Sequence, residues 1–217
     1  MALVKSTNVP KDAVVVDEFE AASYAWDLIS EWEPASDTWA LRYSIGVLGG
    51  LSSVSGMIIN NHFRKKLKLG TYGHMSSLIP VSLLPGIFTA LFHRHSVSTH
   101  MLLMKAETCP LCYELRSGAI QLALGIAYPI VLAPTSALMY ANRYNTYRLP
   151  NLTSKPLELL KFVYKLSKPL SATLVFCSTA HVVASAVLTH YEMKNHLTVR
   201  RKMLDIEAKF DAERNRK

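Results

Sequence analysis

The chain contains one pair of cysteines at a spacing that supports metal binding or redox chemistry. Cys109 and Cys112 are separated by a proline and a leucine, within the predicted connection of residues 93–117. Two thiolates at this spacing can bind zinc together, or they can cycle between a dithiol and a disulfide. Zinc needs four ligands, and the sequence holds no second Cys-x-x-Cys pair. Three interpretations therefore remain open: a disulfide between Cys109 and Cys112, a zinc site, and two ordinary thiols.

Histidine is the second residue type in this connection that can bind a metal. The run from His93 through His95 to His100 is similar to the histidine boxes of membrane oxygenases. Those enzymes need more histidines, and carboxylates, to hold two metals. The remaining five histidines are scattered singly along the chain, at His62, His74, His181, His190 and His196. We therefore predict no metal site, no cofactor and no enzymatic activity.

His181 is the one polar ring deep within an apolar segment. An ionisable side chain inside a membrane is a functional candidate by default, because burying it there is costly. The alternative that we favour is a neutral imidazole hydrogen-bonded to a neighbouring helix. The predicted spans carry no Asp, Glu, Lys or Arg near their middles. This argues against a proton or ion pathway through the protein.

These side chains must be positioned by apolar segments long enough to cross a bilayer. Residues 118–142 form 25 consecutive residues without a charge. A helix rises about 1.5 Å per residue and a hydrocarbon core is about 30 Å thick, so this segment can span with some tilt. Pro129 and Pro134 lie inside it and would break a helix in water. In a bundle they are tolerated as kinks, because neighbouring helices can satisfy the freed carbonyls.

The same criterion defines the architecture of the whole chain, of which 50% is hydrophobic and 18% charged. The predicted spans are residues 43–60, 72–92, 118–142 and 169–191. We predict an all-α protein, a four-helix transmembrane bundle with amphipathic interfacial helices and charged tails. Its expected parts are a tail with an amphipathic helix (1–40), the membrane domain (41–191) and a charged, helical C-terminal tail (192–217).

The N-terminal tail is acidic. Residues 12–37 carry eight Asp or Glu and no Lys or Arg. A cleaved mitochondrial presequence would be Arg-rich and poor in acids, so we expect none here. An acidic helix is repelled by anionic lipid, which leaves a protein contact or a solvated tail as the two readings of this segment.

Small residues recur every three or four positions along the first span, at Gly46, Gly49, Ser53 and Gly56. Gly46 also forms a Gly-x-x-x-Gly motif with Gly50. Such a stripe lets a second helix backbone approach closely. We expect this face to pack against another helix of the same bundle, with a helix of a partner protein as the alternative.

Basic residues gather after the first span and before the fourth, in a chain of net charge +8. They are Arg64, Lys65, Lys66, Lys68, Lys161, Lys165 and Lys168. The last three share one face of a predicted helix that would lie on anionic lipid. Nucleic acid binding is the other common reason for a basic chain, but no recognition motif is present. We therefore expect these residues to face lipid.

Several short motifs follow one another along residues 43–190. They are Asn60-Asn61-His62-Phe63-Arg64-Lys65, Glu107-Thr108-Cys109, Arg116-Ser117-Gly118, Gly125, Tyr128-Pro129 and Arg143-Tyr144. In this order the chain resembles the transmembrane protein 126 family of the mitochondrial inner membrane. Cys109 has an equivalent in the family pattern and Cys112 need not. That departure weakens a disulfide or zinc site common to the family.

The resemblance implies an assembly factor without catalytic residues. Members of the family help to build the membrane arm of respiratory complex I, by binding its subunits and other assembly factors. Four spans place both termini on the same side of the membrane. Basic residues are enriched in loops on the inner side, so the dense basic segment Arg64–Lys68 favours a position in the matrix for the loop that contains it. The termini are then expected in the intermembrane space.

Two other classes of function stay open at the level of the sequence. A small transporter or lipid-handling protein would explain the prolines within the spans, at Pro80, Pro85, Pro129 and Pro134. A metal-dependent membrane enzyme would use the histidines and cysteines of residues 93–117.

Overall fold

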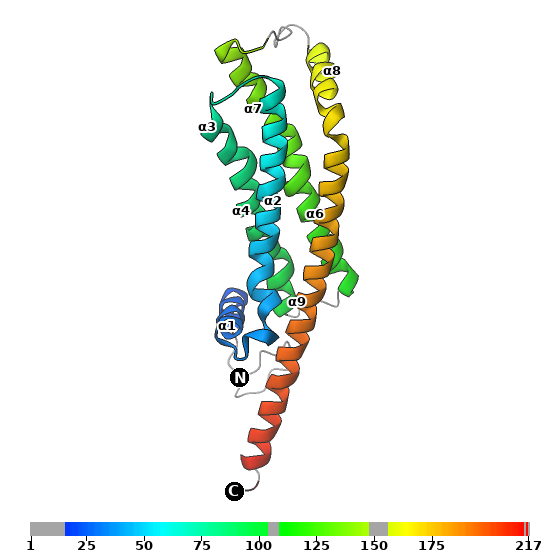
Figure 1. Cartoon of the computed structure of the whole chain (residues 1–217). Helices are drawn as coiled ribbons and strands as arrows, with labels where there is room; N and C mark the ends of the chain where they lie inside the picture. The colour runs from blue at the N-terminus through cyan, green and yellow to red at the C-terminus, as the bar shows by residue number, and fades with distance from the viewer. Residues whose placement is uncertain (1–15, 104–108, 148–155, 215, 217) are drawn as a thin grey trace.

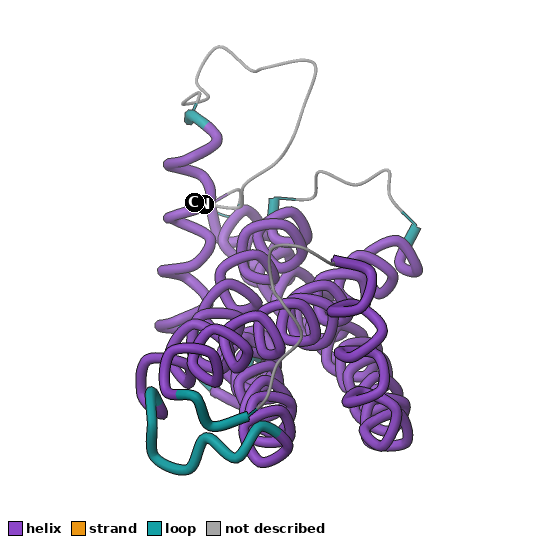
Figure 2. The backbone as a smooth tube through the Cα atoms, turned by 90° about the horizontal axis from the view of Figure 1, so that it is seen from above, coloured by secondary structure: helices purple, strands orange, loops and turns teal. Residues whose placement is uncertain are grey.

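The computed structural model of the chain describes residues 16–103, 109–147, 156–214 and 216. The regular structure in these ranges is helical throughout (Figure 2). Four helical segments are long and apolar enough to cross a membrane: Trp39–Lys66, His74–Leu102, Pro110–Tyr144 and Leu157–Arg214. Consecutive segments run in opposite directions as a bundle (Figure 1). The prediction of an all-α, four-span bundle is confirmed.

The first span is the single helix α2, Trp39–Lys66, and it lies at the centre of the bundle (Figure 1). It contacts helices of each of the other three spans. At about 1.5 Å per residue, its 28 residues cover about 42 Å, more than a hydrocarbon core requires. Leu41, Leu48, Ile59 and Phe63 are buried along its length. A helix in this position must turn more than one face inward, which explains its many small residues.

The second and third spans are built from shorter helical pieces that follow one another without a break. The second consists of α3 (His74–Leu78), η2 (Ile79–Leu83), α4 (Leu84–His93), η3 (Arg94–Thr99) and α5 (His100–Leu102). The third consists of α6 (Pro110–Leu122), η4 (Ala123–Ala127) and α7 (Tyr128–Tyr144). The segments η2, η3 and η4 are π-helical turns. Most of the predicted connection 93–117 is therefore helix, which corrects its assignment as a loop.

Proline explains the position of one of the π-helical turns. The turn η4 ends where the amide of Tyr128 donates to the carbonyl of Ala123, one residue before Pro129. Proline has no N–H to offer the carbonyl four residues earlier, which is that of Gly125. The hydroxyl of Ser55 on α2 donates to this freed carbonyl at 2.8 Å. The expectation that a neighbouring helix satisfies it is therefore confirmed for Pro129.

The fourth span is part of a continuous helical rod. It consists of α8 (Pro156–Ser167), η5 (Lys168–Leu170) and α9 (Ser171–Arg214). The predicted interfacial helix exists as α8, but it continues along the bundle into α9 instead of lying across it (Figure 1). The 44 residues of α9 cover about 66 Å, so α9 extends well beyond a bilayer core.

The end of the bundle that carries α1 (Figure 1) has its own apolar cluster. Helix α1 (Glu18–Glu31) and the turn η1 (Ala35–Asp37) lie there beside α9. Ala25 and Ile29 of α1 pack with Leu41 and with Val199 of α9. The second half of the N-terminal amphipathic helix thus packs within the chain, whereas Phe19 in its first turn is 81% exposed. The other end carries the residues after α2 and the helix α8.

Candidate functional site

A set of buried polar side chains runs through the centre of the bundle and includes a carboxylate. Glu192 of α9 has no exposed surface. Its Oε1 accepts hydrogen bonds from His93 Nε2 at 3.0 Å and from the Ser44 hydroxyl. Its Oε2 accepts one from the Ser98 hydroxyl at 3.1 Å. The carboxylate is thus surrounded by donors from the first and second spans, as a buried charge requires.

His93 extends this contact to the third span. Its second ring nitrogen, Nδ1, lies 3.2 Å from the hydroxyl of Ser117 on α6. A neutral imidazole donates from Nε2 and accepts at Nδ1, whereas an imidazolium donates from both nitrogens. The hydroxyl of Ser117 can pair with the ring in either state. We call Glu192, His93, Ser44, Ser98 and Ser117 the acidic cluster, and it joins all four spans.

A second group of polar side chains lies deeper in the bundle, around His181. Its Nδ1 donates to Gln121 Oε1 at 2.5 Å, and its Nε2 lies 3.1 Å from the Ser55 hydroxyl. Ser52 donates to the same oxygen of Gln121 at 3.1 Å, and Thr89 donates to Ser52 at 3.0 Å. The expectation that His181 is hydrogen-bonded to neighbouring helices is confirmed. This group, the imidazole cluster, also joins all four spans.

A glycine creates the space that the His181 ring occupies. A Cβ atom at Gly125 would lie 2.5 Å from His181 Cε1 and 3.0 Å from both ring nitrogens. These distances are too short for real contacts, so a side chain at this position must displace the imidazole. The carbonyl of the same residue accepts from Ser55. Gly125 therefore serves the cluster through both its missing side chain and its backbone.

The arrangement of Glu192, His93 and Ser117 combines an acid, an imidazole and a hydroxyl, the groups that nucleophilic hydrolases use. All three side chains are 0% exposed. A substrate cannot reach a hydroxyl that has no exposed surface. The cluster instead holds helices together, because its hydrogen bonds connect side chains from all four spans.

The sequence interpretation missed the acidic cluster. Glu192 follows the predicted end of the fourth span by one residue, and it was assigned to the C-terminal tail. A signal was available, because polar residues recur at helical spacing along one face of α9, at His181, Ser185, Thr189, Glu192 and Asn195. All five are buried. A search by helix face would have found the carboxylate.

The stripe of small residues divides between two faces of α2. A Cβ atom at Gly49 would lie 2.8 Å from the carbonyl oxygen of Gly86, and one at Gly56 would lie 3.0 Å from Ser82 Cα. The hydroxyl of Ser82 donates to the carbonyl of Ser53 at 2.6 Å. Gly49, Ser53 and Gly56 therefore pack against the second span of the same chain, as expected.

Gly46 and Gly50 do not share this contact. Both are exposed, and a Cβ atom at either would meet nothing within 4 Å. Val47 and Val54, on the same side of α2, are each 54% exposed. For Gly46 and Gly50 the packing of a partner helix stays a prediction.

The Cys-x-x-Cys pair lies at the start of α6. Cys109 is the residue before the helix and Cys112 is in its first turn, and both are exposed and free. A disulfide between them stays a prediction. His93 is buried in the acidic cluster, whereas His100 Nδ1 accepts from Arg116 Nη1 at 3.1 Å. Within the described residues, no three His, Cys, Asp or Glu side chains lie close enough to hold a metal.

One of the seven basic residues predicted to face lipid does not. Arg64 is buried, and its guanidinium donates to the carbonyls of Gly70, Tyr72 and Gly73 at 2.8–3.2 Å and to the Ser77 hydroxyl at 2.9 Å. Its planar fork of five donors suits a turn whose carbonyls point inward. The assignment of Arg64 to the lipid-facing set is therefore wrong. The six lysines of the set are all exposed.

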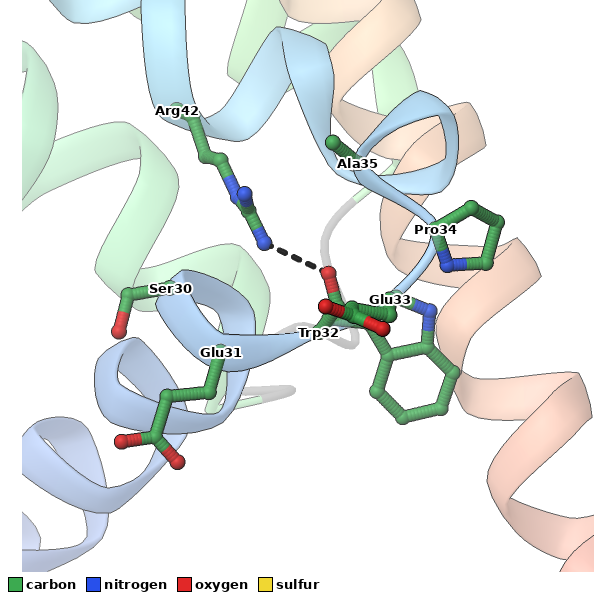
Figure 3. Close-up of a pocket in the computed structure, with 7 residues that line it drawn as sticks. All are labelled: Ser30, Glu31, Trp32, Glu33, Pro34, Ala35 and Arg42. Carbon is green, nitrogen blue, oxygen red and sulfur yellow. Dashed lines mark hydrogen bonds between the residues drawn. The ribbon is translucent and has the colours of Figure 1, made fainter.

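A surface pocket lies between α1 and the start of α2 (Figure 3). It is lined by Ser30, Glu31, Trp32, Glu33, Pro34, Ala35 and Arg42. The guanidinium of Arg42 donates to the carbonyl of Trp32 at 2.8 Å and to that of Ile29 at 2.8 and 3.0 Å. Because these bonds join α2 to the end of α1, we interpret the Arg42 contact as structural.

The two charged tails are joined by an ion pair. Lys202 of α9 donates to Asp37 Oδ2, and Trp32 Nε1 donates to the same oxygen at 3.3 Å. The hydrogen bond from Lys202 lowers the pKa of Asp37 below its ordinary value. Two turns earlier along α9, Asn195 Oδ1 accepts from the amide of Ala40 at 3.0 Å. The C-terminal part of α9 is therefore fastened to the N-terminal region.

Comparisons with known proteins agree on one family. The family profile described as Transmembrane protein 126 matches residues 29–209. Transmembrane protein 126 of Drosophila melanogaster is 36% identical over 213 residues, which cover 98% of this chain and 96% of the relative. Transmembrane protein 126A of Rattus norvegicus is 27% identical over 74% of this chain and 79% of its own. Transmembrane protein 126A of Pongo abelii is 25% identical over 88% of this chain and 90% of its own length. No solved structure gives a significant match.

Proposed function

Because this chain belongs to the transmembrane protein 126 family, we propose that it is a scaffold of the mitochondrial inner membrane that assists assembly of the membrane arm of respiratory complex I. The resemblance of the sequence to that family implies this role. In the proposal the protein binds complex I subunits and other assembly factors, and it carries out no catalytic step.

One observation carries the proposal for this particular chain. The polar side chains of the spans point inward and bond to one another, in the acidic and imidazole clusters. Such a core fixes the relative positions of four helices without needing a ligand. The outward faces of the spans are then free for other proteins. This division suits a scaffold, whose task is to present surfaces in a fixed arrangement.

The test of the role is a knockout complemented with defined variants. Removal of the protein should lower assembled complex I on native gels and leave complexes III and IV mostly intact, since their membrane arms do not share its contact surfaces. A double variant, Cys109→Ser with Cys112→Ser, should restore complex I as well as the wild-type protein does. Normal complex I in the knockout would contradict the proposal. Rescue by the wild type alone would favour chemistry at the cysteines instead.

A sharper test addresses the outward face of α2. Gly46→Leu and Gly50→Leu place bulk where nothing lies within 4 Å, so the bundle should keep its thermal stability. If a partner helix packs closely there, the variant should lose co-purifying complex I subunits and fail to rescue assembly. Val54→Leu, on the same face but without a glycine, is the matched control. Wild-type rescue by the glycine variant would mean that this face contacts lipid.

The proposal also includes an orientation, with both termini in the intermembrane space. Cys109 and Cys112 are exposed near the end of the bundle that carries α1, and Cys177 is buried. A membrane-impermeant maleimide added to mitoplasts should therefore modify the native cysteines. The same reagent should not reach Lys65→Cys in a background with Cys109→Ser and Cys112→Ser. The opposite labelling pattern would place the termini in the matrix.

A further inference from the structure

We propose that the end of the bundle formed by the last turn of α2 and by α8 binds the headgroups of anionic phospholipid. The surface consists of Lys65, Lys66, Lys68, Lys161, Lys165 and Lys168, which we call the lysine surface. This inference concerns the membrane around the protein and does not depend on a role in complex I assembly.

The two groups of lysines are about a hundred residues apart in sequence, and the fold brings them to one end. His62 Nε2 lies 3.0 Å from the carbonyl oxygen of Leu166, which joins α2 to α8. Leu159, Phe162, Val163 and Leu166 of α8 pack on the apolar cluster that includes Phe63 and Leu67. Lys65 and Lys66 follow His62 by one helical turn, and Lys165 directly precedes Leu166. The contact therefore places both groups at the same end of the bundle.

The charge of this end is strongly one-sided. The six lysines are exposed, and the structure gives none of them a carboxylate partner among the described residues. The sequence from Thr38 to Ala106 contains no Asp or Glu, and Glu158 is the one acid between Arg116 and Tyr191. Several positive charges held together without compensation attract a surface of negative charge.

Apolar side chains beside the lysines favour lipid over a protein or a nucleic acid as the partner. Leu157, Leu160 and Tyr164 of α8 are 73%, 69% and 73% exposed. They lie on the outward side of α8 with Lys161 and Lys168, since the opposite side packs on the bundle. A helix at the bilayer boundary typically carries lysine, tyrosine and leucine on one face. The aliphatic parts of the lysine side chains enter the lipid, and their ammonium groups reach the phosphates.

Native mass spectrometry of the purified full-length protein tests this proposal. The protein in detergent is titrated with phosphatidylglycerol or with phosphatidylcholine of the same acyl chains. The test variant is Lys65→Gln, Lys66→Gln, Lys161→Gln and Lys165→Gln. The matched control is Lys194→Gln, Arg200→Gln, Arg201→Gln and Lys209→Gln, which removes four exposed charges from the opposite end of the rod.

The wild-type protein should retain more phosphatidylglycerol than phosphatidylcholine. Each lysine near an anionic surface adds to the attraction, so the test variant should lose at least about tenfold of this preference. The control variant should stay within about twofold of the wild type. An equal loss of the preference for phosphatidylglycerol in both variants would mean that net charge alone causes it, and this would overturn the proposal. A wild-type protein that retains both lipids equally would overturn it as well.

Salt dependence keeps the proposal testable if the fourfold variant fails to fold. Screening at high ionic strength should weaken the wild-type preference for phosphatidylglycerol, because the lysines are exposed. A preference that is unchanged between about 50 mM and 500 mM salt would mean that the headgroup charge is not what is recognised, and this would overturn the proposal as well.

Discussion

The Glu192 carboxylate is predicted to be the side chain on which the packing of the bundle depends most. Glu192→Ala leaves His93 Nε2 and the hydroxyls of Ser44 and Ser98 facing an empty space in the protein interior. Leaving the hydrogen-bond partners of a buried carboxylate unpaired costs about 3–5 kcal/mol in total. For a chain of this size, 1 kcal/mol corresponds to a shift of about 2–4 °C. We therefore expect the midpoint of thermal unfolding in detergent to fall by about 6–20 °C.

Three further variants make this prediction specific. Glu213→Ala makes the same substitution at an exposed position of the same helix and should leave the midpoint unchanged. Glu192→Gln keeps one carbonyl acceptor and should cost less than Glu192→Ala, about 1–2 kcal/mol. The double variant Glu192→Leu with His93→Leu replaces both partners by apolar side chains. It should be more stable than the sum of the single changes predicts, because no unpaired partner is left.

Two results would refute the reasoning about this cluster. Glu192→Ala could unfold within about 2 °C of the wild type, which would mean that the carboxylate has no net role in packing. Alternatively, the effects of the Glu192 and His93 substitutions could be strictly additive. Residues in direct contact are expected to show a coupling of about 0.5–3 kcal/mol, so additivity would show that the two side chains do not interact in the membrane.

Three more predictions follow from the packing and the charges. Gly56→Ala should destabilise the bundle, because its Cβ atom meets the backbone of Val81 and Ser82. The control Gly50→Ala lies in open space and should be neutral or stabilising by up to about 1 kcal/mol. Equal midpoints of thermal unfolding for the two variants would contradict the close approach of α2 and η2. Gly125→Ala should displace the His181 ring and lower the midpoint of thermal unfolding, whereas the control Gly46→Ala should not. Unchanged chemical shifts of the His181 imidazole in Gly125→Ala would argue against the contact between Gly125 and this ring. Asp37→Asn should lower stability at neutral pH, because it removes the negative charge that pairs with Lys202. The folded-state pKa of Asp37 is lowered, so the difference from wild type should be full above the ordinary Asp pKa of about 3.9 and vanish as the pH falls through the lowered value. A difference in stability that grows at acid pH would have the wrong sign.

The number of spans, their helical character and the uneven charge of the two ends all follow from the amino-acid sequence. The reason lies in the solvent, because inside a bilayer each backbone N–H and C=O must be bonded within the segment. A charge-free stretch such as residues 118–142 therefore has few alternatives to a helix. The same logic anticipated that Pro129 would be tolerated, although it did not identify Ser55 as the side chain that satisfies the freed carbonyl.

The ends of the helices were harder to predict, because charged residues can continue a helix beyond the hydrocarbon. Hydropathy ended the fourth span at Tyr191, but α9 continues to Arg214. Averaging over a window also removes the difference between the faces of a helix. The charge of Glu192 and of Arg64 predicts a position outside the bundle, whereas the helix faces that carry them place both side chains inside it.

The tertiary structure alone decided which polar side chains meet. Glu192 lies 99 residues from His93 and 148 residues from Ser44 along the chain, and only the crossing of α2, α4 and α9 brings them together. It also decided which glycines face inward, since Gly49 and Gly50 are neighbours in sequence but differ by 100° around a helix. Helical spacing defines the faces of each span, and the packing of the spans against one another determines what each face contacts.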